Sequence, residues 1–223
     1  MGKGKPLQTR ATVDTKPFVS PTKTDDTFRP LLRGSLIHRY LTKWNNDYWI
    51  SFGDWLAEPR YSASYEAKAK IVIRQTGDSL IATLDRQQFV VRDNLYTILA
   101  RSKFADLRFL LGLLNSTLLR WFYQNVINPE QGEALAQVKR SHLDALPIRT
   151  LDLAEPSEKK QHDEMVRLVE MMLSTQKQLA AATNENDRTY LQSKADGLDR
   201  QIDELTCDLY GLTSEERALV AGG

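Results

Sequence analysis

The sequence predicts an α+β protein: a small, curved, mostly antiparallel β-rich domain, followed by a helix and a long antiparallel two-helix hairpin. Three patterns support this prediction. Short β-branched and aromatic segments alternate with turns up to about residue 101, an apolar 3–4 spacing follows over 104–126, and a heptad seam occupies the C-terminal third. The 223 residues are enough for one large domain or two small ones. We expect an arm or linker over 1–29, the β-rich domain over 30–150 and the helical region over 151–223.

Five segments in the β-rich region have the composition of strands. They are Tyr48–Phe52, Ala69–Arg74, Ser79–Leu84, Phe89–Val91 and Leu95–Ala100. Gln75–Asp78 separates two of them and predicts a hairpin turn. Residues 1–29 are rich in Lys, Thr, Asp and Pro and show little periodicity, which favours an extended arm. A chain that begins in this way is expected to be part of a longer polypeptide.

The remaining residues have helical spacing. Leucines from Leu107 to Leu118, together with Trp121, predict a helix over 104–126, and Gln137–Arg140 form a short basic turn after it. The last helix carries a seam with separations of 4, 3, 4, 3 and 4, formed by Leu191, Ala195, Leu198, Ile202, Leu205 and Leu209. Asn184 or Asn186 is expected to cap it and Gly211 to end it. Two helices of this length cannot bury all of their apolar residues against each other. We therefore expect one side of the hairpin to dock on the β-rich domain or on another domain.

Charge is divided between the two regions, although the net charge is only +1. Residues 1–150 contain 22 basic and 14 acidic residues, and residues 151–223 contain 8 basic and 15 acidic residues. A basic block joined to an acidic helical block suggests one part that meets a polyanion and another that meets protein.

Composition excludes several classes of protein. No run of about 18 apolar residues predicts a membrane span, and the first residues lack the apolar stretch of a secretory signal. A single cysteine, Cys207, excludes an internal disulfide and fits a reducing cytoplasm. Cys207 and three scattered histidines do not have metal-ligand spacing.

Catalytic motifs are also absent from the sequence. It has no phosphate-binding glycine loop, no dinucleotide fingerprint and no nucleophile elbow. Asp78 and Asp85 flank a strand in the manner of a metal-nuclease pair, but turn residues explain them better. Cys207 has no histidine near it in the sequence and is better explained as an inert thiol.

Binding is the better prospect. Lys70–Asp78 places Arg74, Gln75 and Thr76 at the exposed end of an apolar strand, where Arg and Gln side chains match the edges of guanine and adenine. A hairpin tip is also polar simply because it is exposed, so this alternative stays open. Other cations could neutralise phosphates, or could form an ordinary solvated surface. These are Arg33, Arg39, Arg60, Lys70, Lys139 and Arg140. Aromatic residues lie between these charges, and base stacking by one of them is a further alternative.

Five blocks, in order, resemble the TaqI-like C-terminal specificity domain, the target-recognition part of adenine DNA methyltransferases and of fused restriction–modification enzymes. They cover roughly residues 30 to 213. The blocks are Pro30–Tyr40, Lys70–Asp78 with Ala82–Asp85, Leu110–Ser116, Gln137–Ile148 and Gln201–Thr213. Each block is weak alone, and the five together are specific.

The resemblance implies that this chain binds double-stranded DNA and positions a methyltransferase domain or subunit that uses S-adenosylmethionine. It further implies that the parent enzyme flips an adenine out of the helix. The Asn-Pro-Pro-Tyr motif which that chemistry needs is missing, because Asn128-Pro129 is followed by Glu130-Gln131. We therefore expect this chain to lack catalysis and cofactor, with the catalytic part upstream, on a separate subunit, or lost.

An alternative function is a helical protein-interaction module that assembles a multisubunit DNA-modification or phage-defence complex. In that case the helical hairpin forms the contact with a partner protein or with a second copy of this chain in a homodimer. The sequence gives neither the recognised DNA site nor whether the parent enzyme also cleaves DNA.

Overall fold

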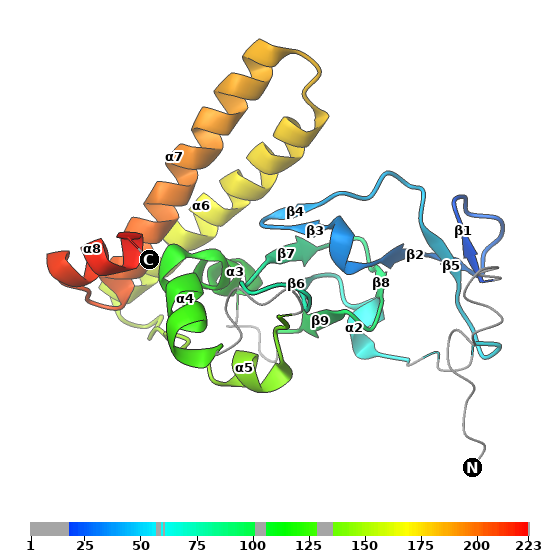
Figure 1. The fold of residues 1–223 in the computed structure, drawn as a ribbon, viewed down its shortest axis with the longest axis horizontal. Helices are drawn as coiled ribbons and strands as arrows, with labels where there is room; N and C mark the ends of the chain where they lie inside the picture. Colours follow the sequence, from blue (N-terminus) through cyan, green and yellow to red (C-terminus); the bar gives the residue numbers. More distant parts are fainter. Residues whose placement is uncertain (1–17, 57–58, 60, 101–105, 129–135, 223) are drawn as a thin grey trace.

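The computed structural model describes residues 18–56, 59, 61–100, 106–128 and 136–222. Small sheets lie at one end of the molecule and long helices at the other (Figure 1). The strands are β1 (Val19–Ser20), β2 (Phe28–Leu32), β3 (Ile37–His38), β4 (Leu41–Thr42), β5 (Trp49–Ser51), β6 (Lys70–Arg74), β7 (Ala82–Asp85), β8 (Val90–Val91) and β9 (Leu95–Ile98). The helices are η1 (Gly34–Leu36), α2 (Ala63–Glu66), α3 (Leu107–Asn115), α4 (Thr117–Phe122), η2 (Tyr123–Ile127), α5 (Arg140–Asp144), α6 (Pro156–Ala181), α7 (Glu185–Leu209) and α8 (Ser214–Gly222). The α+β prediction is confirmed, and no helix within these ranges is long and apolar enough to cross a membrane.

The strands form three small sheets, with the orders β1-β5-β2-β8, β3-β4 and β7-β6-β9. Most pairings are antiparallel, as expected, but β2 and β8 are parallel. The strands therefore do not form the single curved sheet that the sequence suggested. Within the four-stranded sheet, β2 changes partner along its length. Phe28–Pro30 pair with β5, whereas Leu31 and Leu32 pair with β8.

The arm predicted over residues 1–29 needs correction at its C-terminal end. Val19–Ser20 form β1, which pairs with β5, and β2 begins at Phe28. Phe18 and Val19 pack against a buried cluster that contains Leu31 and Ile50. Pairing and apolar packing therefore join residues 18–20 to the β-rich region, and residues 1–17 lie outside the described part of the chain.

The single helix predicted over 104–126 is interrupted at Ser116. Its hydroxyl donates to the Leu113 carbonyl at 2.7 Å and accepts from the Leu119 N–H at 3.2 Å, which caps α4. The side chain of the neighbouring Asn115 bonds both backbone groups of one residue of β7, as the backbone of an adjacent strand would. Its Oδ1 accepts from the Ala82 N–H at 3.1 Å, and its Nδ2 donates to the Ala82 carbonyl at 3.0 Å. The Asn-Ser pair therefore breaks the helix and attaches it to the sheet edge.

Helices α6 and α7 form the predicted antiparallel hairpin, which projects from the rest of the molecule (Figure 1). Asn184 caps α7, since its Oδ1 accepts from the Asp187 N–H at 2.8 Å. Gly211 follows α7 with a φ of 66°, the left-handed conformation that favours glycine. The caps predicted from the sequence are confirmed.

The hairpin docks on the β-rich region through α3. Gly112 makes this contact close, because a Cβ at that position would lie 2.4 Å from Met165 Sδ and 3.0 Å from Val169 Cγ2. One buried cluster unites Ile71 and Ile73 of β6 with the seams of both long helices. The apolar seam is therefore buried within the chain, and a homodimer through the hairpin would have to use other surfaces.

Some of the opposite charges of the two regions pair with each other at this same junction. Among the described residues, four ion pairs join the basic and acidic blocks: Arg39–Asp199 at 2.7 Å, Arg86–Glu170 at 2.7 Å, Arg108–Glu170 at 3.6 Å and Arg149–Glu158 at 3.0 Å. The acidic hairpin thus faces the basic region along its base, and only the remaining cations are available for an external polyanion.

We expect replacement of Glu170 by Gln to lower stability at pH 7 by at most about 1 kcal/mol, because the pair is half exposed and screened. Hydrogen bonding from Arg86 holds the pKa of Glu170 below its ordinary value of 4.5. A lowered folded pKa gives stability above 4.5 that is lost as the pH falls through the folded value. Urea unfolding should therefore separate the variant from wild type at neutral pH but not in strong acid. A difference that persists in strong acid would contradict this account.

Candidate nucleic-acid interface

Four segments that are distant in the sequence meet at the C-terminal end of β6. We call them the four-segment surface: Arg33–Gly34, Arg74–Gly77, Asn94 and Ala136–Arg140. The Gln75 N–H donates to the Asn94 carbonyl at 3.0 Å, and the Val138 N–H donates to the Gln75 carbonyl at 2.8 Å. The Gly34 N–H donates to Asn94 Oδ1 at 3.3 Å. Backbone hydrogen bonds therefore fix the arrangement.

Strand alternation decides which side chains share a side. Thr76 and Gln137 form an antiparallel bridge, so their side chains lie on the same side. Arg74 is two residues before Thr76, and Lys139 is two residues after Gln137, so alternation brings both to that side. Val138, between Gln137 and Lys139, is fully buried. One side thus presents a guanidinium, a hydroxyl, an amide and an ammonium group.

The predicted trio Arg74, Gln75 and Thr76 is divided by the same rule. Gln75 lies on the opposite side of the strand from its two neighbours. Its backbone binds both Asn94 and Val138. The main contribution of Gln75 in this structure is to hold the segments together.

Positive charge is concentrated around this surface. Arg33 is exposed, with its guanidinium 4.9 Å from the centre of the Tyr48 ring. Burial lowers the pKa of His38, and the charges of Lys43 and Arg74 lower it further. Within the described ranges no carboxylate forms an ion pair with Arg33, Lys43 or Arg74. These three cations can therefore meet an anion from outside the chain.

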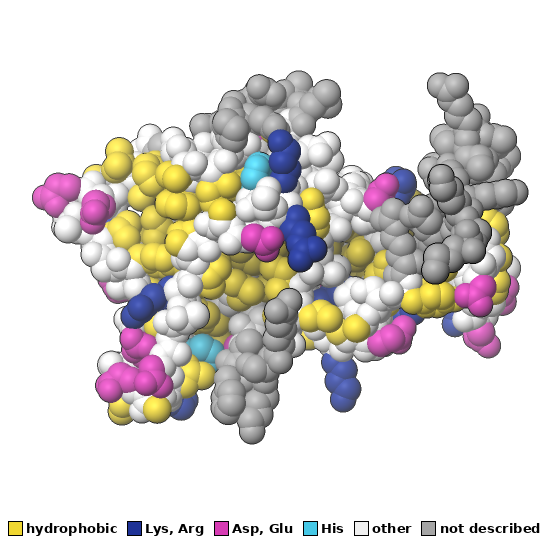
Figure 2. Space-filling model, turned by 90° about the horizontal axis from the view of Figure 1, so that it is seen from below, with side chains coloured by type: hydrophobic (Ala, Val, Ile, Leu, Met, Phe, Trp, Pro, Cys, Tyr) yellow, Lys and Arg dark blue, Asp and Glu magenta, His cyan; other side chains and the backbone are white. Residues whose placement is uncertain are grey.

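Lys139 and Arg140 are exposed and stand at the start of α5. The Lys139 N–H donates to His142 Nδ1 at 3.3 Å, and this ring nitrogen also lies 3.3 Å from the hydroxyl of the buried Tyr123. Arg140 makes a long, exposed pair with Asp144 at 3.7 Å. The face seen in Figure 2 carries Lys and Arg side chains near its middle, beside a broad hydrophobic area.

Two residues that the sequence predicted to contact phosphates do not belong to this surface. Lys70 is fully buried, with its Nζ 2.6 Å from Asp85 Oδ2 and 2.9 Å from the Phe89 carbonyl oxygen, so it cannot reach a phosphate. Arg39 binds Asp199 and the Asn115 carbonyl at the hairpin junction. Both cations stabilise the fold instead. Arg60 lies outside the described residues.

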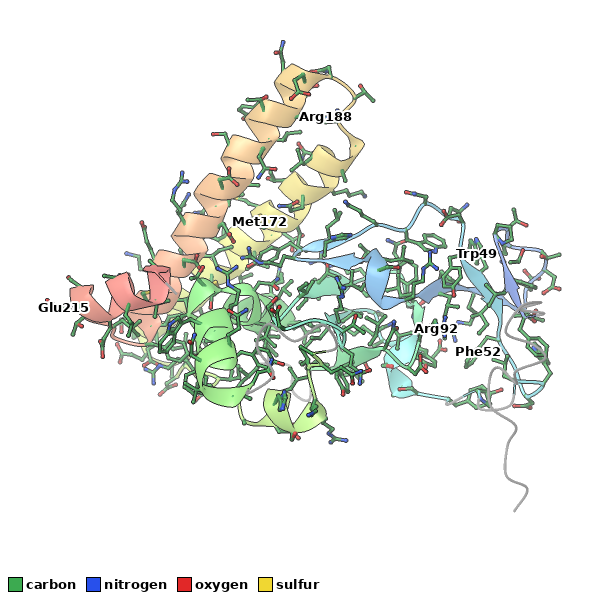
Figure 3. All side chains as sticks on the ribbon, in the orientation of Figure 1. Trp49, Phe52, Arg92, Met172, Arg188 and Glu215 are labelled. Atoms are coloured by element: carbon green, nitrogen blue, oxygen red, sulfur yellow. The ribbon has the colours of Figure 1, made fainter. Side chains whose placement is uncertain are left out.

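Most aromatic residues of the β-rich end pack on one another. Trp44 contacts Trp49 and Phe89 edge-to-face, at 5.1 and 5.0 Å between ring centres. Figure 3 places Trp49 and Phe52 at this end, on the side away from the helices. Trp55 is half exposed, and its indole N–H donates to the Ser51 carbonyl at 3.1 Å. Packing thus accounts for most of the aromatic residues interleaved with the charges.

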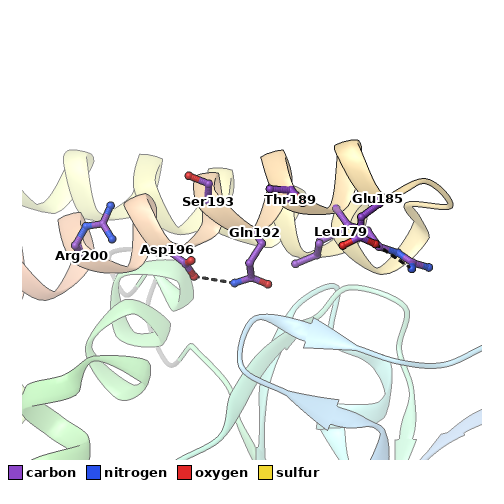
Figure 4. A pocket seen from close by; sticks show the side chains of 8 residues that line it. Leu179, Glu185, Thr189, Gln192, Ser193, Asp196 and Arg200 are labelled. Carbon is purple, nitrogen blue, oxygen red and sulfur yellow. Dashed lines mark hydrogen bonds and ion pairs between the residues drawn. The ribbon is translucent and has the colours of Figure 1, made fainter.

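A shallow groove of about 600 Å³ runs along the outer part of the hairpin (Figure 4). One lining residue, Leu179, comes from α6, and the other seven are polar or charged residues of α7: Glu185, Arg188, Thr189, Gln192, Ser193, Asp196 and Arg200. The part of the chain that the structure describes contains no cluster of three or more acidic, histidine or cysteine residues that could hold a metal.

Comparison with known proteins identifies one family. The model of the TaqI-like C-terminal specificity domain matches residues 29–148, more than half of the chain. This range contains all four segments of the surface. No curated protein matches the chain. The family match supports a role in DNA recognition within methyltransferase-like proteins.

Proposed function

Because the chain belongs to the TaqI-like C-terminal specificity domain family, we propose that its four-segment surface binds double-stranded DNA and selects a site for an adenine DNA methyltransferase. The meeting of four segments around the end of β6 carries this proposal. In this proposal Arg74 and Thr76 contact base edges. Arg33, Lys139 and Arg140 are proposed to contact phosphates, which orient a protein on the duplex.

Methylation itself is assigned to a part outside this chain. In this proposal the methylation motif also lies outside the chain: Asn128, the asparagine of the Asn-Pro pair, is 3% exposed, and its N–H donates to the Tyr123 carbonyl at 2.8 Å. Family membership implies association with a methyltransferase part. In this proposal the chain contributes recognition, and the methyltransferase part contributes the cofactor and the chemistry.

We expect the pair Arg33→Ala and Lys139→Ala to weaken duplex binding and to lower the salt slope. Each phosphate contact that is lost should reduce the slope of log K against log salt by about 1, so the pair should lose about 2. Fluorescence anisotropy of the full chain with a labelled duplex, over a range of salt concentrations, gives both quantities.

The matched control is the pair Lys160→Ala and Lys177→Ala, which removes the same charge from exposed positions on α6. It should leave the slope nearly unchanged. Equal losses from both pairs would mean that net charge, and not this surface, determines binding. A wild-type chain that binds no duplex in about 50 mM salt would overturn the proposed function.

A further inference from the structure

Asn94 is held in one orientation at the centre of the four-segment surface. Its side-chain oxygen accepts from the Gly34 N–H at 3.3 Å, and its carbonyl accepts from the Gln75 N–H at 3.0 Å. The oxygen end of the amide is therefore occupied. The nitrogen end, with its two hydrogens, has no acceptor among the residues that the structure describes.

Gly34 allows Asn94 and Thr76 to approach its backbone closely, and we call the small site that these residues border the niche. A Cβ on Gly34 would lie 3.1 Å from Asn94 Nδ2 and 3.5 Å from Thr76 Oγ1, so both polar atoms border the same space. Arg74 adjoins it, because its Nε donates to Thr76 Oγ1 at 3.1 Å. Four residues from three segments thus surround one small polar site.

The groups around this niche are mainly hydrogen-bond donors. Asn94 offers its NH₂ group, and Arg74 offers the terminal nitrogens of its guanidinium. Thr76 Oγ1 already accepts from Arg74, which leaves its O–H proton to donate. A site of this kind favours a partner edge that carries acceptors and disfavours one that carries an amino group.

We infer that Asn94 is a specificity-determining residue and that the niche reads a guanine in the major groove. Guanine presents two acceptors there, N7 and O6, whereas adenine and cytosine each present an amino donor and thymine presents the single acceptor O4 beside a methyl group. This inference rests on the proposed function, since it requires that the four-segment surface meet DNA. It adds Asn94 to the proposed base-contacting residues Arg74 and Thr76, and it specifies guanine as the base.

The test is Asn94→Asp in the full chain, which retains an oxygen acceptor for Gly34 and replaces the NH₂ donor by a second acceptor. Wild type and variant would each be used to select duplexes from a randomised library. Wild type should enrich a site with a fixed guanine. The variant should lose preference for that guanine by about tenfold or more and should shift toward a base that carries an amino group.

Gln137→Glu is the matched control, because it adds the same charge at an exposed position of the same surface. It should weaken binding overall while keeping the guanine. Thr76→Val provides a second variant, which retains the backbone bridge between positions 76 and 137. It should lose less of the preference for guanine than Asn94→Asp does. A fixed guanine that survives Asn94→Asp, or a selected site without a fixed guanine, would overturn the inference. Absence of any selection by wild type would count against the proposed function itself.

Discussion

Replacing Lys70 by Met is expected to lower the free energy of unfolding by about 3–5 kcal/mol. Lys70 and Asp85 are both fully buried, 2.6 Å apart, and they pair across the β6–β7 ladder. Asp85 also accepts the N–H groups of Gln87 and Phe89, so its carboxylate fixes the turn after β7. Without Lys70 that charge stays buried without its partner, and this accounts for the large cost.

Urea unfolding of two further variants would distinguish the cost of an unpaired buried charge from the cost of the Lys-to-Met change itself. Lys70→Met combined with Asp85→Asn removes both charges, so it should recover part of the loss. Lys177→Met makes the same side-chain change at an exposed position and should unfold close to wild type. A single Lys70 variant as stable as the Lys177 variant would show that the ion pair is not buried.

Asn115→Ala is expected to be the second most destabilising change, by about 2–4 kcal/mol. It leaves the Ala82 N–H without an acceptor in a fully buried position and opens a small cavity. The Ala82 carbonyl retains the Tyr40 N–H as a donor, which limits the loss. The measurement is the urea midpoint together with hydrogen exchange at Ala82.

Asn125→Ala is the control for that change. Asn125 is exposed, and its Nδ2 donates only to the Trp121 carbonyl of the preceding turn, at 2.9 Å. Its removal should cost no more than about 0.5 kcal/mol. If the Asn115 variant is no less stable than the Asn125 variant, the side chain does not attach α3 to the sheet.

The sequence was sufficient for features that depend on neighbouring residues. The seam of α7, the cap at Asn184 and the end at Gly211 follow from spacing and local chemistry, and the structure confirms each one. The interruption at Ser116 did not follow from the sequence, because apolar residues continue at helical spacing on both sides of it. Only the tertiary contact between Asn115 and Ala82 shows why the helix breaks there.

The candidate site was predictable only in part, for a similar reason. Charge and position pointed to Arg74, Thr76 and Lys139, which the structure brings together. The same criteria also selected Lys70, because the residue type does not reveal that the side chain faces a buried aspartate. Asn94 was missed because it lies in an ordinary polar turn after Asp93, and only its hydrogen bonds connect it to Gly34 and Gln75.

Hydrogen exchange of the full chain, with and without a DNA duplex, tests the central claim most directly. The four-segment surface predicts that DNA protects amides around Arg33–Gly34, Arg74–Gly77, Asn94 and Ala136–Arg140 together. Exchange near the hairpin tip, around Thr183–Tyr190, should stay unchanged, since these exposed residues lie far from the end of β6 (Figure 1). Protection at the hairpin tip, with none at the four segments, would contradict the account.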